Sequence, residues 1–149
     1  MTTTTPPTIN LRAQAPDAYR ALAGVERALA TSTLEPGLRE LVKLRASQLN
    51  GCAYCLRTHM QAARKHAVGE TKLDVLGAWH DADVFDDRER AALAVTDALT
   101  LIAQGTTVDA AIEEARHVFD ETEIAALVFT IAIMNAWNRL HGPAHTTIP

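Results

Sequence analysis

The chain has 149 residues, of which 48% are apolar, and its formal net charge is −4. These values allow one globular domain whose folding buries about 70% of the surface of the unfolded chain. They exclude the strongly basic surface of a nucleic-acid-binding protein. The longest apolar run, residues 124–134, is about half as long as a membrane span. We therefore expect neither nucleic acid nor a membrane among its partners.

The N-terminal stretch carries few structural signals. Residues 1–15 are rich in Thr and Pro, show no helical periodicity, and lack the basic and apolar segments of a secretion signal. We expect a flexible arm over residues 1–15, followed by a single helical domain over residues 16–149. Without an export signal we expect a cytoplasmic protein, and in that reducing compartment a structural disulfide is rare.

Apolar residues recur at helical spacing in about seven segments, and no segment alternates with period two. In chain order, the predicted helices cover residues 16–30, 36–50, 52–67, 70–79, 88–103, 108–119 and 121–141. The last of these is apolar on all sides at its middle, which is typical of a central helix. The predicted fold class is therefore all-α, a compact multi-helix domain.

Prolines and glycines mark the expected ends of these helices. Pro16 and Pro36 suit the first turns of the first two helices. Gly69 is predicted to be the left-handed residue that ends the third helix. Gly142 and Pro143 are predicted to close the last helix.

The chemistry of the chain is concentrated at its only two cysteines, Cys52 and Cys55, at the start of the third helix. Unpaired N–H groups and the positive end of a helix dipole favour thiolates there. Two cysteines one helical turn apart can also form a disulfide with little rearrangement. In a reducing compartment this spacing indicates a redox-active pair or a metal site rather than a structural disulfide.

His59 follows Cys55 by four residues, so the two side chains are neighbours on the helix surface. The imidazole could take the thiol proton and later protonate a leaving group. If Gly51 turns the second and third helices into a hairpin, Glu40 comes within one helical turn of the level of His59. A carboxylate there would orient the imidazole. On spacing alone, however, an ordinary surface carboxylate is the commoner interpretation of Glu40.

Two other interpretations of the dithiol segment stay open. Cys52 and Cys55 could simply pack in the core, or they could bind zinc together with His59 and His66. His59 and His66 would lie about 10 Å apart along one helix, too far to complete a tetrahedral site with both cysteines. Redox chemistry is therefore favoured over a metal site. No sequence feature selects a flavin, haem or nicotinamide, so no cofactor is expected.

Several aromatic and histidine residues have no firm chemical assignment. Tyr54, between the two cysteines, either lines a pocket or packs in the core. His141 is predicted to interact with the negative end of a helix dipole. Trp79, Trp137 and Phe129 are predicted to be core residues.

The segment ELVKLRASQLNGCAYC, residues 40–55, followed by His59, resembles the core of the AhpD-like alkylhydroperoxidases. These belong to the carboxymuconolactone decarboxylase superfamily. The spacing of the glutamate, the two cysteines and the histidine is the most specific part of the resemblance. The segments RAAL (90–93) and NAWNRL (135–140) are also similar, and the resemblance extends over about residues 16–142.

The resemblance implies an AhpD-like helical fold, a homo-oligomer (trimer or hexamer) and thiol peroxidase activity. Carried onto this chain, it implies that Cys55 is the peroxidatic thiol and Cys52 the resolving thiol, with Glu40 and His59 as a proton relay. The substrate would be a hydroperoxide and the reductant a lipoyl- or thioredoxin-like dithiol. The best-characterised AhpD proteins carry a second histidine directly before the second cysteine. Here that position is Tyr54, so the relay is shorter.

The predicted function is thus a thiol-dependent peroxidase that reduces hydroperoxides through a dithiol–disulfide cycle. One alternative is a decarboxylase-like enzyme of the same superfamily, whose turnover would be indifferent to loss of Cys52. The other is a non-enzymatic redox-responsive stress protein, in which the disulfide would change the assembly.

Overall fold

The computed structural model describes residues 8–144, which form eight α-helices and two short 3₁₀ helices without any strand. The 3₁₀ helices, η1 (Leu76–Ala78) and η2 (Ile102–Gln104), follow α5 and α6. The α-helices are α1 (Leu11–Gln14), α2 (Pro16–Ala30), α3 (Pro36–Asn50), α4 (Ala53–Lys65), α5 (Glu70–Val75), α6 (Asp87–Thr100), α7 (Val108–Ala115) and α8 (Glu121–Ala144). The prediction of an all-α fold is confirmed.

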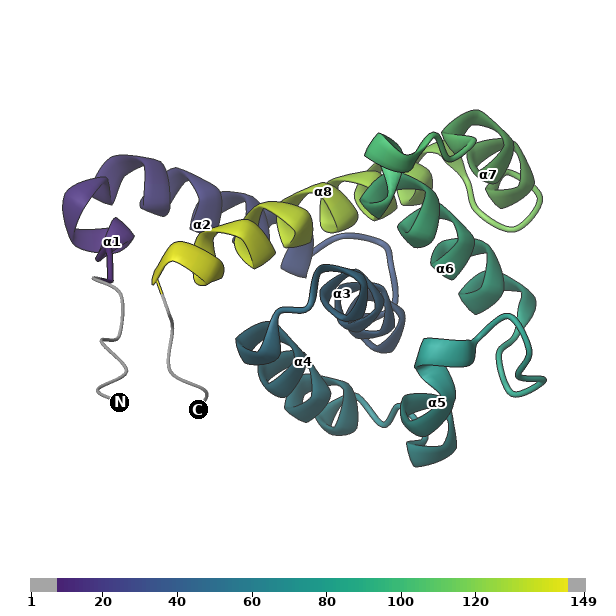
Figure 1. Ribbon diagram of the computed structural model, residues 1–149. Coiled ribbons are helices and arrows are strands. Elements are labelled where there is room, and N and C mark those ends of the chain that lie inside the picture. Colours follow the sequence, from purple (N-terminus) through teal and green to yellow (C-terminus); the bar gives the residue numbers. More distant parts are fainter. Residues whose placement is uncertain (1–7, 145–149) are drawn as a thin grey trace.

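Helix α3 lies in the middle of the molecule, and the long helix α8 runs along one side of it, in contact with α2, α3 and α6 (Figure 1). α3 packs against α4, α6 and α8, whereas α2 lies along α8 and α7 packs against α6. A helix with neighbours on several sides must be apolar over most of its surface. This explains why α8 has an apolar middle and why α3 buries eight of its fifteen residues.

The core consists of three apolar clusters, each of which surrounds part of α3 or α8. The first joins α3, α6, α7 and α8 around Leu127, and the second joins α3 to α4, α5 and η1 around Leu76. The third contains the dithiol, packed with Trp137 of α8 and flanked by side chains of α2. A fully buried Leu contributes about 1.5–3 kcal/mol to folding. The dithiol is thus built into a well-packed layer.

Two helix ends differ from the sequence-based expectation. α4 closes with Ala67, at φ 59°, as its left-handed residue, while Gly69 is the N-cap of α5. The Val68 N–H donates to the Ala63 carbonyl at 3.0 Å. This bond completes a Schellman motif without help from glycine. The prediction for Gly69 was therefore wrong.

The second difference is at the end of α8, which continues through Gly142 and Pro143 to Ala144. A proline in a helix interior removes one hydrogen bond and crowds the preceding turn. Because α8 ends one residue later, only the terminal turn of the helix bears this cost.

Phe129 was predicted to be a core residue, but it is 61% exposed. Trp79 and Trp137, the other two aromatic residues of that prediction, are 4% and 9% exposed. Because the middle of α8 is apolar on all sides, its sequence pattern does not distinguish the face that lies outermost. Phe129 projects from that outer face.

The expected N-terminal arm falls only partly within the described residues. Residues 1–7 lie outside them, while residues 11–14 form the short helix α1 with Asn10 as its N-cap. Within residues 8–144 no helix combines the length and the apolar character needed to cross a membrane.

Candidate functional site

The turn at Gly51 positions the dithiol at the start of α4. Gly51 ends α3 in the left-handed conformation, at φ 66°, which costs a residue without a side chain little. Cys52 follows directly as the N-cap of α4, and the Cys55 N–H donates to its Sγ at 3.3 Å. The predicted placement of the cysteine pair at a helix N-terminus is confirmed.

Cys52 and Cys55 are joined by a disulfide, with their Cα atoms 5.4 Å apart. Cys52 is 8% exposed to solvent, and Cys55 is 2% exposed. When the pair is reduced, the free N–H groups and the dipole of the 13-residue helix α4 favour a thiolate at this position. The local geometry therefore accommodates both the dithiol and the disulfide.

The hairpin of α3 and α4 brings Glu40 to His59, as the spacing predicted. Glu40 Oε2 lies 2.7 Å from His59 Nδ1, and both side chains are largely buried. With Nδ1 directed at the carboxylate, the opposite ring nitrogen, Nε2, points away from Glu40. This is the arrangement by which a carboxylate orients an imidazole that acts as a base.

Glu40 is held in its ionised form by its surroundings. Burial raises the pKa of Glu40, but the hydrogen bond to His59 and the charges of His59 and Lys43 together outweigh that effect. The pKa of Glu40 therefore lies below its usual range. An ionised Glu40 can stabilise a positive charge on His59.

A buried lysine lies next to Glu40. Lys43 Nζ is 2.9 Å from Glu26 Oε2, which comes from α2, and 3.8 Å from Glu40 Oε1. Lys43 is only 9% exposed. Since a buried ammonium group needs compensation by opposite charge, the two carboxylates account for its burial.

A cavity of about 210 Å³ lies beside the dithiol, between α2, α4 and α8. Of the two cysteines, only Cys55 lines it, together with His59 and Thr58. The Thr58 Oγ1 atom is buried and has no hydrogen-bond partner among the described residues. An apolar cavity of about 150 Å³ is sufficient to hold benzene, so this cavity has room for a small organic molecule next to Cys55.

The sequence of the protein and its structure both match known proteins. The family model described as the carboxymuconolactone decarboxylase family matches residues 15–98. The uncharacterized protein YdfG of Bacillus subtilis (strain 168) is 34% identical over 126 residues, which cover 85% of this chain and 86% of YdfG. The chain belongs to the carboxymuconolactone decarboxylase family.

Solved structures place it in the AhpD-like part of this family. A protein of unknown function from Agrobacterium tumefaciens, described as a candidate antioxidant defence protein AhpD, is 34% identical with a TM-score of 0.88. The match covers 95% of this chain and 97% of that one. The AhpD-like fold predicted from the sequence is confirmed.

Two more distant structures share the fold. The debrominase Bmp8 has a TM-score of 0.80 at 22% identity, over 92% of this chain and 74% of its own. An uncharacterized peroxidase-related protein from Ralstonia eutropha JMP134, with an alkylhydroperoxidase AhpD core, has a TM-score of 0.80 at 23% identity, over 93% and 74%. The AhpD-like fold therefore occurs in proteins described by different chemistries.

In this family member, the structure brings His141 into the cavity, a role that the sequence did not predict. His141 lies in the last turn of α8, as expected, but its ring is 4.4 Å from the ring of Tyr54 and 6.1 Å from that of Trp137. Burial lowers the pKa of His141, and the charge of His59 lowers it further. The signal was the helical spacing of Met134, Trp137 and His141, which places them on one face.

Tyr54 and Tyr19 complete the wall of the cavity. Tyr54, the residue between the two cysteines, lines the cavity and packs on His141, so it fills both of the roles considered for it. Tyr19 of α2 lies edge-on to Trp137, with ring centroids 5.1 Å apart. The cavity therefore presents an aromatic wall opposite Cys55 and His59.

A buried amide network ties the end of α3 to α8. Asn50 Nδ2 donates to Asn135 Oδ1 at 3.0 Å and to Asn138 Oδ1 at 2.9 Å. Asn138 Nδ2 in turn donates to Ser47 Oγ at 3.1 Å. Because Asn50 directly precedes the turn at Gly51, this network fixes the start of α4 relative to α8.

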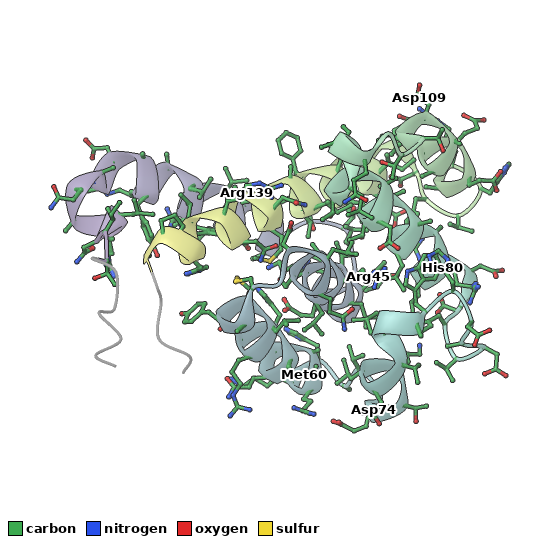
Figure 2. The ribbon with its side chains drawn as sticks, viewed as in Figure 1. Arg45, Met60, Asp74, His80, Asp109 and Arg139 are labelled. Carbon is green, nitrogen blue, oxygen red and sulfur yellow. A yellow bond between two sulfur atoms is a disulfide. The ribbon has the colours of Figure 1, made fainter. Side chains whose placement is uncertain are left out.

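A second polar cluster lies on the other side of α3. Arg45 binds both oxygens of Asp97, at 2.6 and 2.8 Å, and His80 Nε2 lies 3.3 Å from Asp97. Arg45 and His80 project on the side of α3 that faces away from α4 (Figure 2). This cluster holds the segment after α5 against α6 and is remote from the dithiol.

The zinc interpretation of the segment finds no structural counterpart in residues 8–144. No group of three or more His, Cys, Asp or Glu side chains within that range is arranged to hold a metal ion. His66, the residue considered as a fourth ligand, is exposed at the C-cap of α4.

Proposed function

We propose that the protein is a thiol-dependent peroxidase that reduces hydroperoxides through a Cys52–Cys55 dithiol–disulfide cycle. The observation that carries the proposal is the lining of the cavity, which includes both Cys55 and the Glu40-bound His59. Membership of the AhpD-like group supports the proposal, because its members include proteins described as peroxidase-related.

In the first step, His59 accepts the proton of the Cys55 thiol, and the thiolate attacks the terminal oxygen of the hydroperoxide. The O–O bond breaks, Cys55 becomes a sulfenic acid, and the second oxygen leaves as an alkoxide. The protonated His59 returns its proton to that oxygen, so that an alcohol is released. Glu40 would stabilise the imidazolium between these two transfers.

In the second step, the Cys52 thiol attacks the sulfur of the sulfenic acid and releases water, which leaves the disulfide seen in the structure. The sum is one hydroperoxide and two thiols converted into one alcohol, one water and one disulfide. An external dithiol, lipoyl- or thioredoxin-like, would then reduce the pair by exchange. Because Cys55 lines the cavity and Cys52 does not, Cys55 is the thiol assigned to meet the peroxide.

Thr58 is a candidate for positioning the hydroperoxide. Its Oγ1 atom is buried without a hydrogen-bond partner among residues 8–144, and its side chain lines the cavity. A buried hydroxyl left without a partner costs free energy. Because the Thr58 side chain lines the cavity, it would contact a hydroperoxide bound there.

Homo-oligomer formation, as a trimer or hexamer, belongs to the same proposal. Phe129 is 61% exposed on α8, flanked one turn away by the exposed residues Ala125 and Ala132. Exposed aromatic side chains are enriched in subunit interfaces. Sedimentation analysis should give a particle of several subunits, and Phe129→Glu should reduce its mass. A wild-type monomer would contradict this part of the proposal.

A second candidate function is reductive dehalogenation of an aromatic ring. It is favoured by the aromatic wall of the cavity and by the shared fold with the debrominase Bmp8. The dithiol supplies the two electrons that such a reaction needs: one aryl bromide and two thiols would give the arene, a disulfide and hydrogen bromide. Release of bromide from 2,3,4-tribromopyrrole by the reduced protein would favour this candidate over the peroxidase.

Stopped-flow measurement of hydroperoxide consumption by the reduced protein tests the peroxidase proposal. We expect the wild type to consume cumene hydroperoxide and the Cys55→Ser variant to lose that activity. A Cys55→Ser variant with the wild-type rate would exclude the proposed chemistry.

A further inference from the structure

Four charged or titratable side chains near the dithiol form a continuous series of contacts. Glu26 of α2 lies 2.9 Å from Lys43 of α3, which lies 3.8 Å from Glu40, which lies 2.7 Å from His59 of α4. Glu26 and His59, the two ends of the series, both line the cavity beside Cys55. The series thus starts and finishes at the place where a substrate would bind.

The charges of this series do not cancel while His59 is neutral. The two carboxylates and the one ammonium group then sum to one negative charge. When His59 is protonated, the sum is zero. The low dielectric of a protein interior strengthens the interactions between such charges.

We propose that Lys43 and Glu26 are positioning residues, which set the charge of the site so that the series becomes neutral when His59 takes the Cys55 proton. The inference rests on the dithiol chemistry proposed above and adds two residues to it. Lys43 touches Glu40 rather than any reacting atom, and Glu26 acts through Lys43.

The other titratable groups around the series do not supply the compensating charge. The phenol side chains of Tyr19 and Tyr54 line the same cavity as His59. His141 faces it from α8, where burial lowers the pKa of the imidazole and favours its neutral form. His66, beyond the end of α4, also interacts with Glu40 but is exposed to solvent. Lys43 thus acts on the charge of Glu40 directly, and Glu26 acts through its ion pair with Lys43.

The inference predicts opposite effects for two substitutions. Lys43→Met removes a positive charge, which makes every nearby group harder to deprotonate, so the ionisation of Cys55 should move to higher pH. Glu26→Gln removes a negative charge and should move it to lower pH. A role in packing alone would change the rate or the stability without moving the pH profile in opposite directions.

The test uses the full-length protein with Cys52→Ser, so that Cys55 is its only thiol. The rate of alkylation by iodoacetamide, measured between pH 5 and 9, reports the ionisation of Cys55 without any peroxide. On the acid limb, the rate of a single thiolate changes about tenfold per pH unit. We expect Lys43→Met to slow alkylation there by about threefold or more, and Glu26→Gln to accelerate it by a similar factor.

Matched controls separate this effect from a general change of surface charge. Lys65→Met and Glu114→Gln remove the same charges at exposed positions that do not line the cavity and should leave the pH profile unchanged. Lys43→Arg should restore most of the wild-type profile. If Lys43→Met does not fold, the partly exposed Glu26→Gln carries the test by itself.

These experiments distinguish failure of the charge-series inference from failure of the peroxidase proposal. Unshifted profiles in both Lys43→Met and Glu26→Gln, or shifts in the same direction, would overturn the inference even if the wild type reduces hydroperoxides. Opposite shifts in a protein that consumes no hydroperoxide would support the charge series and overturn only the peroxidase proposal.

Discussion

Glu40 and His59 lie 2.7 Å apart, although they are nineteen positions apart in the sequence. The contact exists because Gly51 reverses the chain between α3 and α4 within a single left-handed residue. The contact buries the Glu40 carboxylate against the His59 imidazole, and His59 lines the same cavity as Cys55. The proposed proton relay therefore depends on a turn more than ten residues away from Glu40 in the chain.

Replacement of His59 by Gln should strongly slow hydroperoxide reduction. The variant keeps the dithiol but loses the base that accepts the Cys55 proton, and a positioned base typically contributes about 10²–10⁴-fold in rate. Glu40→Gln should give a smaller loss, because the imidazole remains but is no longer held by a charge. Stopped-flow consumption of cumene hydroperoxide measures both effects.

The exposed His117 provides the control for this pair. His117→Gln should retain the wild-type rate. If His59→Gln also retained it, His59 would not be the base.

Cys52→Ser should separate the two chemical steps. Without the resolving thiol, Cys55 should reduce one hydroperoxide per subunit and stop as a sulfenic acid, which dimedone would trap. Turnover with an external dithiol should then be slowed strongly. Mass spectrometry of the trapped adduct on Cys55 measures the first step. Absence of a dimedone adduct on Cys55, or an unchanged turnover rate, would contradict the assigned roles.

The placement of the dithiol, Glu40 and His59 could be predicted from the sequence, because signals close together in the chain determine it. The helix boundaries at Pro16 and Pro36, the reversal at Gly51 and the spacing of Glu40 and His59 all follow from residues close in the chain. A hairpin of two helices has few registers, so the level of Glu40 relative to His59 follows from counting residues on either side of the turn. Whether these residues act in catalysis stays a prediction.

The remaining part of the site could not be predicted, because it depends on long-range packing. Lys43 has the sequence pattern of a solvated residue beside the apolar stripe of α3, and its burial becomes understandable only with Glu26 of α2 next to it. His141 reaches the cavity only because α8 lies across the start of α4. Phe129 was assigned to the wrong side of α8, since a helix that is apolar all round carries no directional signal.

Asn138→Ala should destabilise the fold. Asn138 is 7% exposed, accepts a hydrogen bond from Asn50 and donates one to Ser47. Its removal leaves buried partners unsatisfied, which costs about 1–3 kcal/mol. Urea unfolding at fixed protein concentration measures the change. Thr122→Ala, at an exposed position at the start of α8, should stay within about 0.5 kcal/mol of wild type, and an equal effect of both substitutions would contradict the role of the network.

Protonation of His141 should make the fold sensitive to mild acid. Burial lowers the pKa of His141 in the folded protein, whereas an unfolded histidine titrates near 6.5. The unfolded chain therefore binds the proton more readily, so the stabilising contribution is complete above about pH 6.5 and is lost as the pH falls through the folded value. Between pH 7 and 5 the wild type should lose more free energy of unfolding than His141→Asn. Parallel losses in both proteins would contradict the prediction.

Glu40 should add a second loss of stability at lower pH. The pKa of Glu40 lies below its usual range in the folded protein, and an unfolded glutamate titrates near 4.3. Its contribution is therefore present above about pH 4.3 and is lost as the pH falls through the folded value. Urea unfolding of wild type and Glu40→Gln between pH 6 and 3 should show a steeper decline for the wild type. A steeper decline for the variant would have the wrong sign.

Hydroperoxide reduction and formation of the Cys52–Cys55 disulfide should be one event. The most direct measurement is a single turnover of the reduced wild-type protein with a substoichiometric amount of cumene hydroperoxide, followed by mass spectrometry. We expect one intramolecular Cys52–Cys55 disulfide for each hydroperoxide converted into its alcohol. Loss of hydroperoxide without formation of this disulfide, or a reduced protein that leaves the hydroperoxide intact, would contradict it.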